Sequence, residues 1–250
     1  MGRRYSKSPI IEAVCEFRFE PGEWDSAMFG LVWKKVAEVF EERRDVQAAL
    51  QLELVPTSEG TQQRLVPEPR PRMQYLSKDG RLTLVMGPDV LSVNRLAPYS
   101  SWEEFKPIVR QGFDAYVSSV APKVIRRTGL RYINRIEFPG ERIELDEYLN
   151  FRPFLGPTLP QDHASFIAGV EFVYQPEKDL LRLQLASVPP AKEQLFAVIL
   201  DLDHFSPIPG SVPVKVQPVV DWLDRAHERV ESVFEGTITD RLRLMFGEEV

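Results

Sequence analysis

Residues 10–19 read IIEAVCEFRF, and this stretch decides the fold together with residues 124–138, VIRRTGLRYINRIEF. Every second residue of the first stretch is apolar, namely Ile11, Ala13, Cys15, Phe17 and Phe19. This alternation is typical of a strand that buries one face. Pro-Gly follows each stretch, at residues 21–22 and 139–140, and ends it. We expect the two strands to open two related halves of the chain.

The first half, residues 1–122, continues with a predicted helix over residues 24–44, where apolar residues recur at three- and four-residue spacing. A strand is predicted over residues 49–55, and a Pro- and Arg-rich stretch follows it over residues 56–72. Asp79-Gly80 is a hairpin signal between predicted strands. The later strands are expected over residues 73–77, 81–86 and 90–96. A helix over residues 102–117 begins at a cap formed by Ser100 or Ser101, with Glu104 in the capping-box position.

The second half, residues 123–250, repeats this order in shortened form. A short helix over residues 146–150 and a Pro-rich loop follow its first strand. Strands are predicted over residues 165–174, 180–187 and 195–202, and a long helix over residues 216–234. Compared with the first half, the second half lacks one strand and its first helix is stunted.

We therefore predict an α+β fold, in which one globular unit contains an antiparallel sheet with helices on one face. The order of elements resembles the β-α-β4-α unit of the TATA-box-binding-protein-like and helix-grip folds. This resemblance implies a duplicated TATA-binding-protein-like architecture, with one unit in each half.

Composition places the chain among ordinary globular proteins, with 43% hydrophobic and 27% charged residues. The net charge of -6 argues against a surface that is basic throughout, as a nucleic-acid or membrane footprint would be. Cys15 is the single cysteine, which fits a reducing compartment. No apolar run approaches the roughly 20 residues that span a bilayer. We expect a cytoplasmic protein without a membrane partner.

Three stretches carry a family resemblance: SPIIEAVCEFRF at residues 8–19, TGLRYINRIEFP at residues 128–139 and HERVESVFEGTITDRLRLMF at residues 227–246. They resemble a prokaryotic protein family that is uncharacterised and occurs sporadically among bacteria and archaea. The resemblance implies a prokaryotic origin. The patchy occurrence of the family suggests accessory cargo, such as a defence or toxin-neutralising system. No functional residue carries over from it.

The most interesting polar residues lie on the two opening strands. Glu12, Glu16 and Arg18 share one face of the first strand, and Arg127, Arg131 and Arg135 share one face of the other. If the strands are neighbours, these side chains meet. They then form either a structural network of ion pairs or a site for an anion such as phosphate.

The spacing of the acidic residues bears on a third alternative. Triphosphate-tunnel enzymes carry E-x-E-x-K on an early strand, whereas this chain has E-x-x-x-E-x-R from Glu12 to Arg18. A metal-dependent phosphohydrolase on the concave face of the sheet is therefore the less favoured alternative, beside a phosphate- or nucleotide-binding protein.

Other candidates for chemistry are weak. Asp201 and Asp203 share a strand face while His204 points away, and the three histidines, with His163 and His227, are scattered. Cys15 alternates with apolar residues and is expected in the core. Nucleotide-binding motifs are lacking. We predict no catalytic residue, no metal site and no cofactor.

The sequence thus favours a non-enzymatic binding or regulatory protein whose partner is another protein, with a homodimer as one form. The sheet face or the Pro-rich loops would bind the partner. Nucleic acid is a less favoured partner because of the acidic total. The residues considered for it are Arg64, Arg70, Arg72, Arg81 and Arg95, with Tyr75, Tyr99 and Tyr132 as stacking surfaces.

Overall fold

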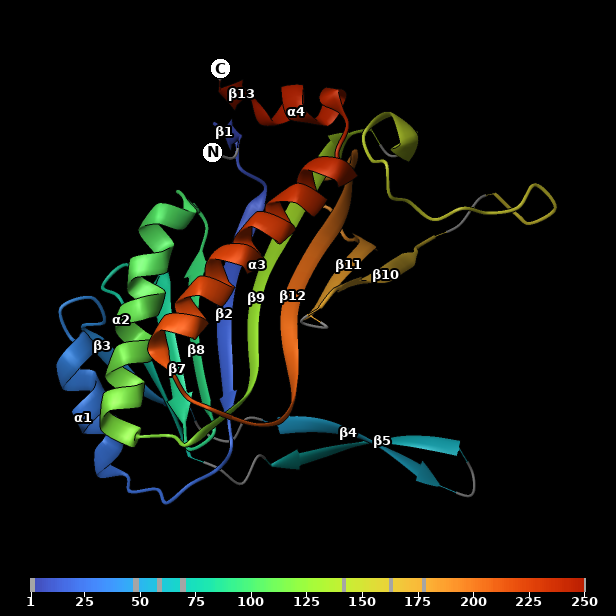
Figure 1. The fold of residues 1–250 in the computed structure, drawn as a ribbon. Coiled ribbons are helices and arrows are strands. Elements are labelled where there is room, and N and C mark those ends of the chain that lie inside the picture. The colour runs from blue at the N-terminus through green and yellow to red at the C-terminus, as the bar shows by residue number, and fades with distance from the viewer. Residues whose placement is uncertain are drawn as a thin grey trace.

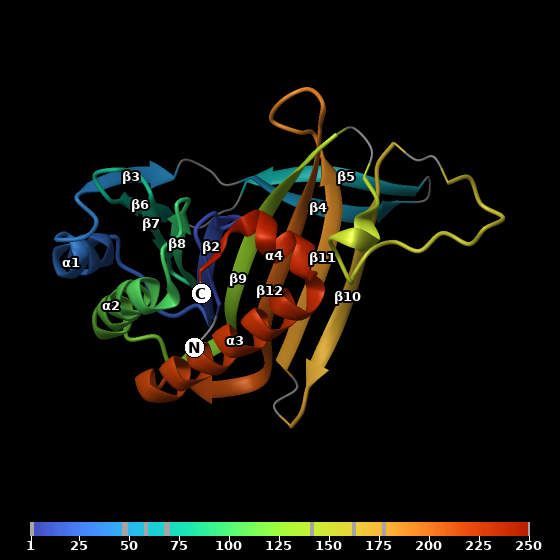
Figure 2. The same ribbon diagram turned by 90° about the horizontal axis from the view of Figure 1, so that it is seen from above.

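A computed structural model describes residues 3–46, 50–57, 60–67, 71–140, 143–161, 164–176 and 179–249. It has an α+β fold built on a nine-stranded sheet with the strand order β10-β11-β12-β9-β2-β8-β7-β6-β3 (Figure 1). Every pairing in this sheet is antiparallel. Helices α1, α2 and α3 all lie on the same side of the sheet (Figure 2).

The strands of the large sheet are, in chain order, β2 (Ile10–Phe19), β3 (Glu42–Val46), β6 (Arg72–Leu76), β7 (Leu82–Gly87), β8 (Val90–Leu96), β9 (Val124–Pro139), β10 (Ile167–Tyr174), β11 (Asp179–Val188) and β12 (Leu195–Pro213). The helices are α1 (Ala27–Val36), α2 (Trp102–Val120), α3 (Val216–Thr237) and α4 (Asp240–Phe246), with a 3-10 turn, η1 (Leu145–Glu147). Two further pairs are β1 (Arg4–Tyr5) with β13 (Glu248–Glu249), and β4 (Leu50–Thr57) with β5 (Gly60–Pro67).

The two opening strands are neighbours at the centre of the sheet, as the sequence predicts. β2 and β9 run antiparallel, with Cys15 opposite Leu130 and Glu16 opposite Gly129. β9 continues along β12 on its other side. The pair therefore joins the strands of the two halves into one sheet.

The core lies between this sheet and the helices. Ala13, Cys15, Phe17 and Phe19 of β2 all face the helices and are at most 3% exposed. Phe17 packs on Phe113 of α2, with 4.6 Å between ring centroids. Cys15 is a core residue, as predicted, and burial raises the pKa of its thiol well above the ordinary value. Burial of such side chains is the main force that stabilises the fold.

Of the two serines predicted as the cap of α2, Ser101 is the N-cap residue. Its hydroxyl accepts a hydrogen bond from the Glu104 backbone N–H at 3.3 Å. The capping box is only half formed, because the Glu104 carboxylate accepts a hydrogen bond from the Ser100 hydroxyl instead. The start of α2 is thus fixed by two neighbouring serines.

Several predicted elements differ from the structure. The helix expected over residues 24–44 ends at Val36, and Glu42–Val46 forms the edge strand β3, because pairing with β6 outweighs helix propensity. The Pro- and Arg-rich stretch contains the strand β5. The short helix expected over residues 146–150 is the single turn η1. β12 extends beyond its predicted end because it follows β9, with a register shift between Pro207 and Val212.

In the described part of the chain, no helix is both long and apolar enough to cross a membrane.

Two helical glycines give a test of this packing. A Cβ atom at Gly112 of α2 would lie 2.9 Å from Leu84 Cδ1 and 3.1 Å from Val93 Cγ2, whereas one at Gly30 of α1 would meet nothing within 4 Å. Gly112→Leu should therefore lower the free energy of unfolding by about 1 to 3 kcal/mol through overpacking. Gly30→Leu should raise it by roughly 0.5 to 1 kcal/mol through helix propensity. Urea denaturation of both variants measures the difference, and equal effects would contradict the packing of α2.

Candidate functional site

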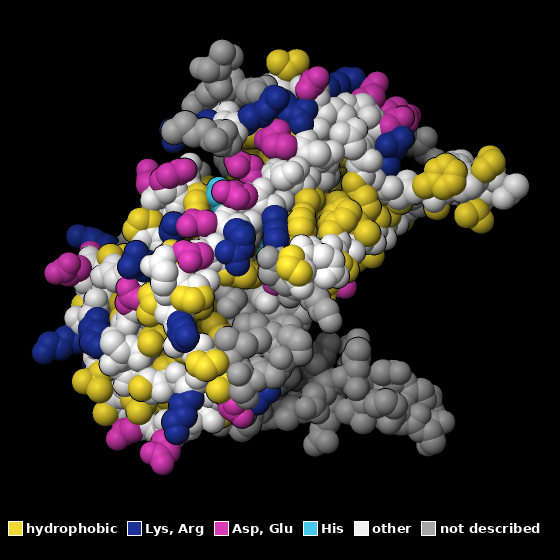
Figure 3. Space-filling model, in the orientation of Figure 1, with side chains coloured by type: hydrophobic (Ala, Val, Ile, Leu, Met, Phe, Trp, Pro, Cys, Tyr) yellow, Lys and Arg dark blue, Asp and Glu magenta, His cyan; other side chains and the backbone are white. Residues whose placement is uncertain are grey.

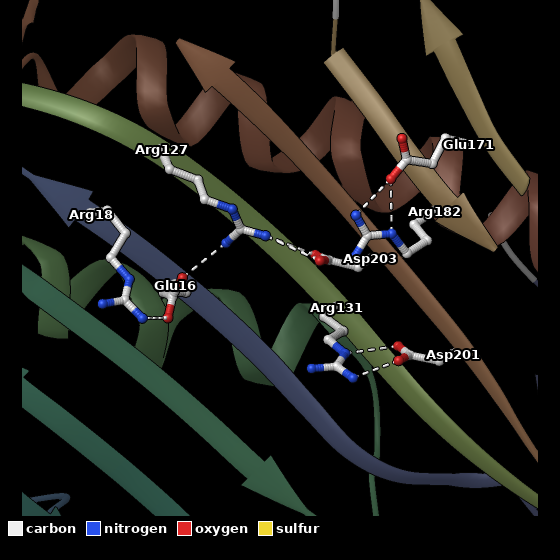
Figure 4. A network of polar contacts seen from close by, with 8 residues as sticks. All are labelled: Glu16, Arg18, Arg127, Arg131, Glu171, Arg182, Asp201 and Asp203. Carbon is white, nitrogen blue, oxygen red and sulfur yellow. Dashed lines mark hydrogen bonds and ion pairs between the residues drawn. The ribbon is translucent and has the colours of Figure 1, made fainter. Parts of the chain in front are cut away.

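The face of the sheet opposite the helices carries a row of charged side chains that crosses the two central strands (Figure 4). Arg127 of β9 donates from Nη1 to Glu16 of β2 at 2.9 Å and from Nη2 to Asp203 of β12 at 3.1 Å. Arg18 donates to the second oxygen of Glu16 at 2.7 Å. One guanidinium therefore ties three adjacent strands together.

Gly129 makes room for this arrangement. It lies opposite Glu16 on β9, and a Cβ atom there would lie 2.6 Å from Arg127 Nη1. Because glycine has no side chain, the Arg127 guanidinium lies over the backbone of its own strand and reaches Glu16. The glycine within a run of strand residues was the sequence signal for this close approach.

A second pair lies beside the first. Arg131 binds both oxygens of Asp201, with Nε to Oδ1 at 2.8 Å and Nη2 to Oδ2 at 2.5 Å. Asp201 and Asp203 share this face, as predicted, whereas His204 lies on the helix side and is fully buried. Burial raises the pKa of Asp203, although the charges of Arg127 and Arg131 lower it. Of these arginines, Arg127 has the larger effect.

The row continues to the outer strands through residues that the sequence reasoning missed. Arg182 of β11 donates to Glu171 of β10 at 2.6 Å. Phe205 lies between the two arginines, 4.8 Å from Arg127 and 5.7 Å from Arg182. Glu171 and Arg182 face each other across a hairpin, and only its strand register shows that they are partners.

The six predicted site residues are only partly brought together. Glu16, Arg18 and Arg127 form one network, and Arg131 lies next to it. Glu12 accepts a hydrogen bond from Asn94 Nδ2 at 2.7 Å instead of pairing with an arginine. Arg135 pairs with Glu137 at 2.8 Å and with the Pro189 carbonyl. A ligand role for these six residues stays a prediction.

The charges on this face largely neutralise one another. Figure 4 contains four arginines and four carboxylates, and each arginine has a carboxylate partner. The side chains lie along the surface of the sheet. Such an arrangement stabilises the sheet by about 0.2 to 1 kcal/mol for each exposed pair. An incoming phosphate would have to displace a carboxylate.

The nucleic-acid interpretation loses two of its stacking surfaces. Tyr75 and Tyr132 are 1% and 4% exposed, so their prediction as stacking surfaces is wrong. Two of the arginines considered for nucleic acid have carboxylate partners. Arg81 Nε lies 4.0 Å from Asp79 Oδ2, and Arg95 Nη2 lies 3.7 Å from Glu104 Oε2. Arg70, His163 and the side chain of Arg64 lie outside the described residues.

The helix side of the sheet holds a buried polar cluster below α3. Asp179, fully buried, accepts hydrogen bonds from Trp222 Nε1 and Arg229 Nη1, both at 3.0 Å. His204 lies beside Trp222 and Tyr174, and burial lowers its pKa to about 4. The histidine is therefore neutral at pH 7. Within the described ranges, no group of three or more His, Cys, Asp or Glu residues could hold a metal ion.

The two edges of the large sheet differ in character. At one edge, β3 presents Glu42, Arg43 and Arg44, charges of the kind that protect an edge strand. At the other edge, β10 is exposed and apolar. Its exposed side chains include Ile167 at 73%, Val173 at 57%, Phe172 at 39% and Val170 at 37%. Figure 3 shows hydrophobic side chains gathered over β10 and β11 and on the projecting loop.

The loop that precedes β10 adds to this surface. Phe154 is 89% exposed and Leu159 is 53% exposed. We call β10 and these two loop residues the apolar edge. Large apolar side chains that gather at one place on a surface mark a site of interaction.

No protein-family model matches the chain, and no curated protein matches it. The family resemblance of the three sequence stretches stays a prediction.

The charged row gives a matched pair of substitutions. Arg127→Met should lower the free energy of unfolding by about 1 to 2 kcal/mol, since it leaves Glu16 and the nearly buried Asp203 without their shared partner. Arg126→Met removes an exposed ion pair with Glu20 and should change the free energy of unfolding by less than about 0.5 kcal/mol. Chemical denaturation of both variants measures the difference. A loss from Arg126→Met as large as that from Arg127→Met would contradict the bridging role.

The buried histidine predicts an acid-sensitive fold. His204 has a pKa of about 4 in the folded protein and about 6.5 when unfolded, so between these values the unfolded chain binds the extra proton. Stability should therefore fall as the pH drops from about 6.5 to 4, by roughly 2 to 3 kcal/mol from this residue. Denaturation curves from pH 7 to pH 4.5 test this. The variant His204→Gln should show a shallower decline, and an unchanged slope would exclude His204 as the cause.

Proposed function

We propose that this protein is a non-enzymatic binding protein, whose edge strand β10 pairs with a strand of a protein partner. The observation that carries the proposal is the exposed apolar character of β10. Strand addition to a free sheet edge is a recurring mode of protein recognition, because the backbone supplies hydrogen bonds and the side chains supply specificity.

The composition of β10 supports this proposal. Its sequence, IAGVEFVY, places Ile167 and Val173 on one face and Val170 and Phe172 on the other. Strands that are apolar on both faces are typical of sheets in which both faces are covered. Its one charge, Glu171, is already paired with Arg182 on β11. Both faces of β10 therefore offer exposed apolar side chains to a partner, beside the backbone groups of its free edge.

The order of the strands supports the duplication implied by the sequence and suggests a position for a partner strand. Outward from β2 lie β8, β7 and β6, and outward from β9 lie β12, β11 and β10. In the first half, β3 covers the outer side of β6. In the second half, no described strand pairs with the outer side of β10. We infer that the halves are TATA-binding-protein-like duplicates, and that the partner strand takes the position that corresponds to β3.

The alternative functions receive less support. A phosphate- or nucleotide-binding protein, or a phosphohydrolase, on the open face would need cations that Glu16, Asp201 and Asp203 already neutralise. A role in a bacterial defence or toxin-neutralising system is compatible with a protein-binding edge, and it rests on the sequence resemblance.

Charge on the apolar edge should abolish partner binding. We expect tagged wild-type protein to recover a stoichiometric protein partner from an extract of its native host, and Ile167→Lys/Val173→Lys to recover at least about tenfold less, since lysine blocks strand addition. Leu244→Lys is the matched control, because Leu244 is 77% exposed and belongs to α4. It should bind as the wild type does.

Two outcomes would contradict the proposal: no stoichiometric protein is recovered, or the edge variant recovers as much as the wild type. Light scattering of the purified protein identifies the special case in which the partner is a second copy. In that case the wild type is a dimer, and Ile167→Lys/Val173→Lys is a monomer.

A further inference from the structure

A cleft lies on the helix side of the molecule, between the start of α2, the middle of α3 and the N-terminal segment around β1. It has a volume of about 530 Å³ and is lined by residues from all three elements. The protein-binding function proposed above does not involve it, since the apolar edge belongs to other residues. Clefts of this size that contain aromatic and a few polar groups are typical sites for small molecules.

Three hydrogen-bonded side chains lie at the cleft. The hydroxyls of Tyr99 and Tyr132 are 3.1 Å apart, and the Tyr132 hydroxyl lies 3.2 Å from Nδ1 of His227. The His227 ring stacks on Trp102, with 4.9 Å between centroids and 16° between planes. The four side chains come from the segment before α2, from α2 itself, from β9 and from α3, so the cleft is fixed by packing of separate elements.

The His227 ring supplies no positive charge to the cleft. Burial lowers the pKa of His227 to about 4, and it raises the pKa of both tyrosines. The ring and the two hydroxyls are therefore neutral at pH 7. A neutral histidine donates a hydrogen bond at one nitrogen and accepts one at the other. The hydrogen-bonded row of Tyr99, Tyr132 and His227 can therefore either donate to a ligand hydroxyl or accept from it.

Carboxylates outnumber guanidinium groups in the lining of the cleft, which contains Glu103, Glu104, Glu231 and Glu235 beside Arg3 and Arg4. Glu235 pairs with Arg243 at 3.0 Å, and Glu104 lies 3.7 Å from Arg95. Arg4 lowers the pKa of Glu103 by its charge. Glu231 of α3 has no ion pair with any residue that the structure describes. Burial and the neighbouring Glu235 raise its pKa, which is the effect of a carboxylate held beside a like charge.

Aromatic rings complete the lining. Tyr5, Tyr99, Trp102 and Phe234 all line the cleft together with Glu231. The faces of such rings suit an organic cation, because the ring quadrupole is negative at the face. The four carboxylates outnumber the guanidinium groups of Arg3 and Arg4 in the lining, which favours a cation over a phosphate.

We propose that this cleft binds a small organic cation that carries an ammonium group, with Glu231 as its counter-charge and the aromatic rings around Trp102 as its walls. The inference stands independently of the protein-binding edge, since either can fail without the other.

The sharpest probe is a pair of ligands of the same shape. Choline carries a quaternary ammonium group, and 3,3-dimethyl-1-butanol replaces its nitrogen with carbon. We expect choline to shift the indole NMR signal of Trp102 and to bind at least about tenfold more tightly than its neutral isostere, since only the charge differs between them. Inorganic phosphate serves as the anionic probe and should leave the signal unchanged.

Substitutions then locate the counter-charge. Glu231→Gln should weaken choline binding at least about tenfold. Glu228→Gln, on the exposed side of the same helix, should leave it unchanged. Equal binding of choline and the isostere would overturn the proposal, as would phosphate binding or an unaffected Glu231→Gln. The comparison of ligands uses the wild-type protein, so it decides the matter even if a variant fails to fold.

Discussion

The structure depends on the antiparallel pairing of β2 with β9. This pair lies at the centre of the large sheet and joins the strands that follow each of its members. Because side chains alternate along a strand, one register fixes two surfaces at once. It aims Cys15 and Phe17 at the helices and Glu16 at Arg127 on the open face. A slip by one residue would place carboxylates in the core, which is why the apolar alternation and the charged row reinforce the same pairing.

The same pairing explains why the two edges of the sheet are unequal. Each central strand is followed outward by three strands, and only the first half continues to a charged fourth, β3. Between β9 and β10 the described residues form η1 and no strand of the large sheet, and β10 lies at the edge. An uncovered strand exposes backbone donors and acceptors, and in β10 it also exposes Ile167 and Val173. The two edges of the sheet therefore differ both in charge and in the apolar area that they expose.

The sequence predicted what depends on local pattern and missed what depends on register. The bounds of β2 and the hairpin at Asp79-Gly80 were predictable, because apolar alternation and turn chemistry are local properties. α1 was predicted too long, because pairing of β3 with β6 is a tertiary effect. The six charged residues were predicted on their strands, and a meeting of carboxylates with arginines across these strands was predicted for neighbouring strands, as Glu16 and Arg127 show. The partner on β12 was not predicted. Arg127 finds Asp203 across 76 positions of sequence. The cleft was missed for the same reason, since Tyr99, Tyr132 and His227 meet only in the folded chain.

Helix α3 is the element that contacts both the cleft and the strands at the apolar edge. On one side it presents His227 and Glu231 to the cleft. On its other side Arg229 lies 4.4 Å over the ring of Tyr174, the last residue of β10, and pairs with the buried Asp179 at the start of β11. Energetic coupling between two distant binding sites is carried by packed side chains and rigid elements that can adopt two discrete arrangements. Asp179 is fully buried and the Arg229 side chain is 19% exposed, and breaking a buried pair costs several kcal/mol, about 3 to 5 in typical cases. Arg229 therefore connects α3 with the last residue of β10 and the first residue of β11.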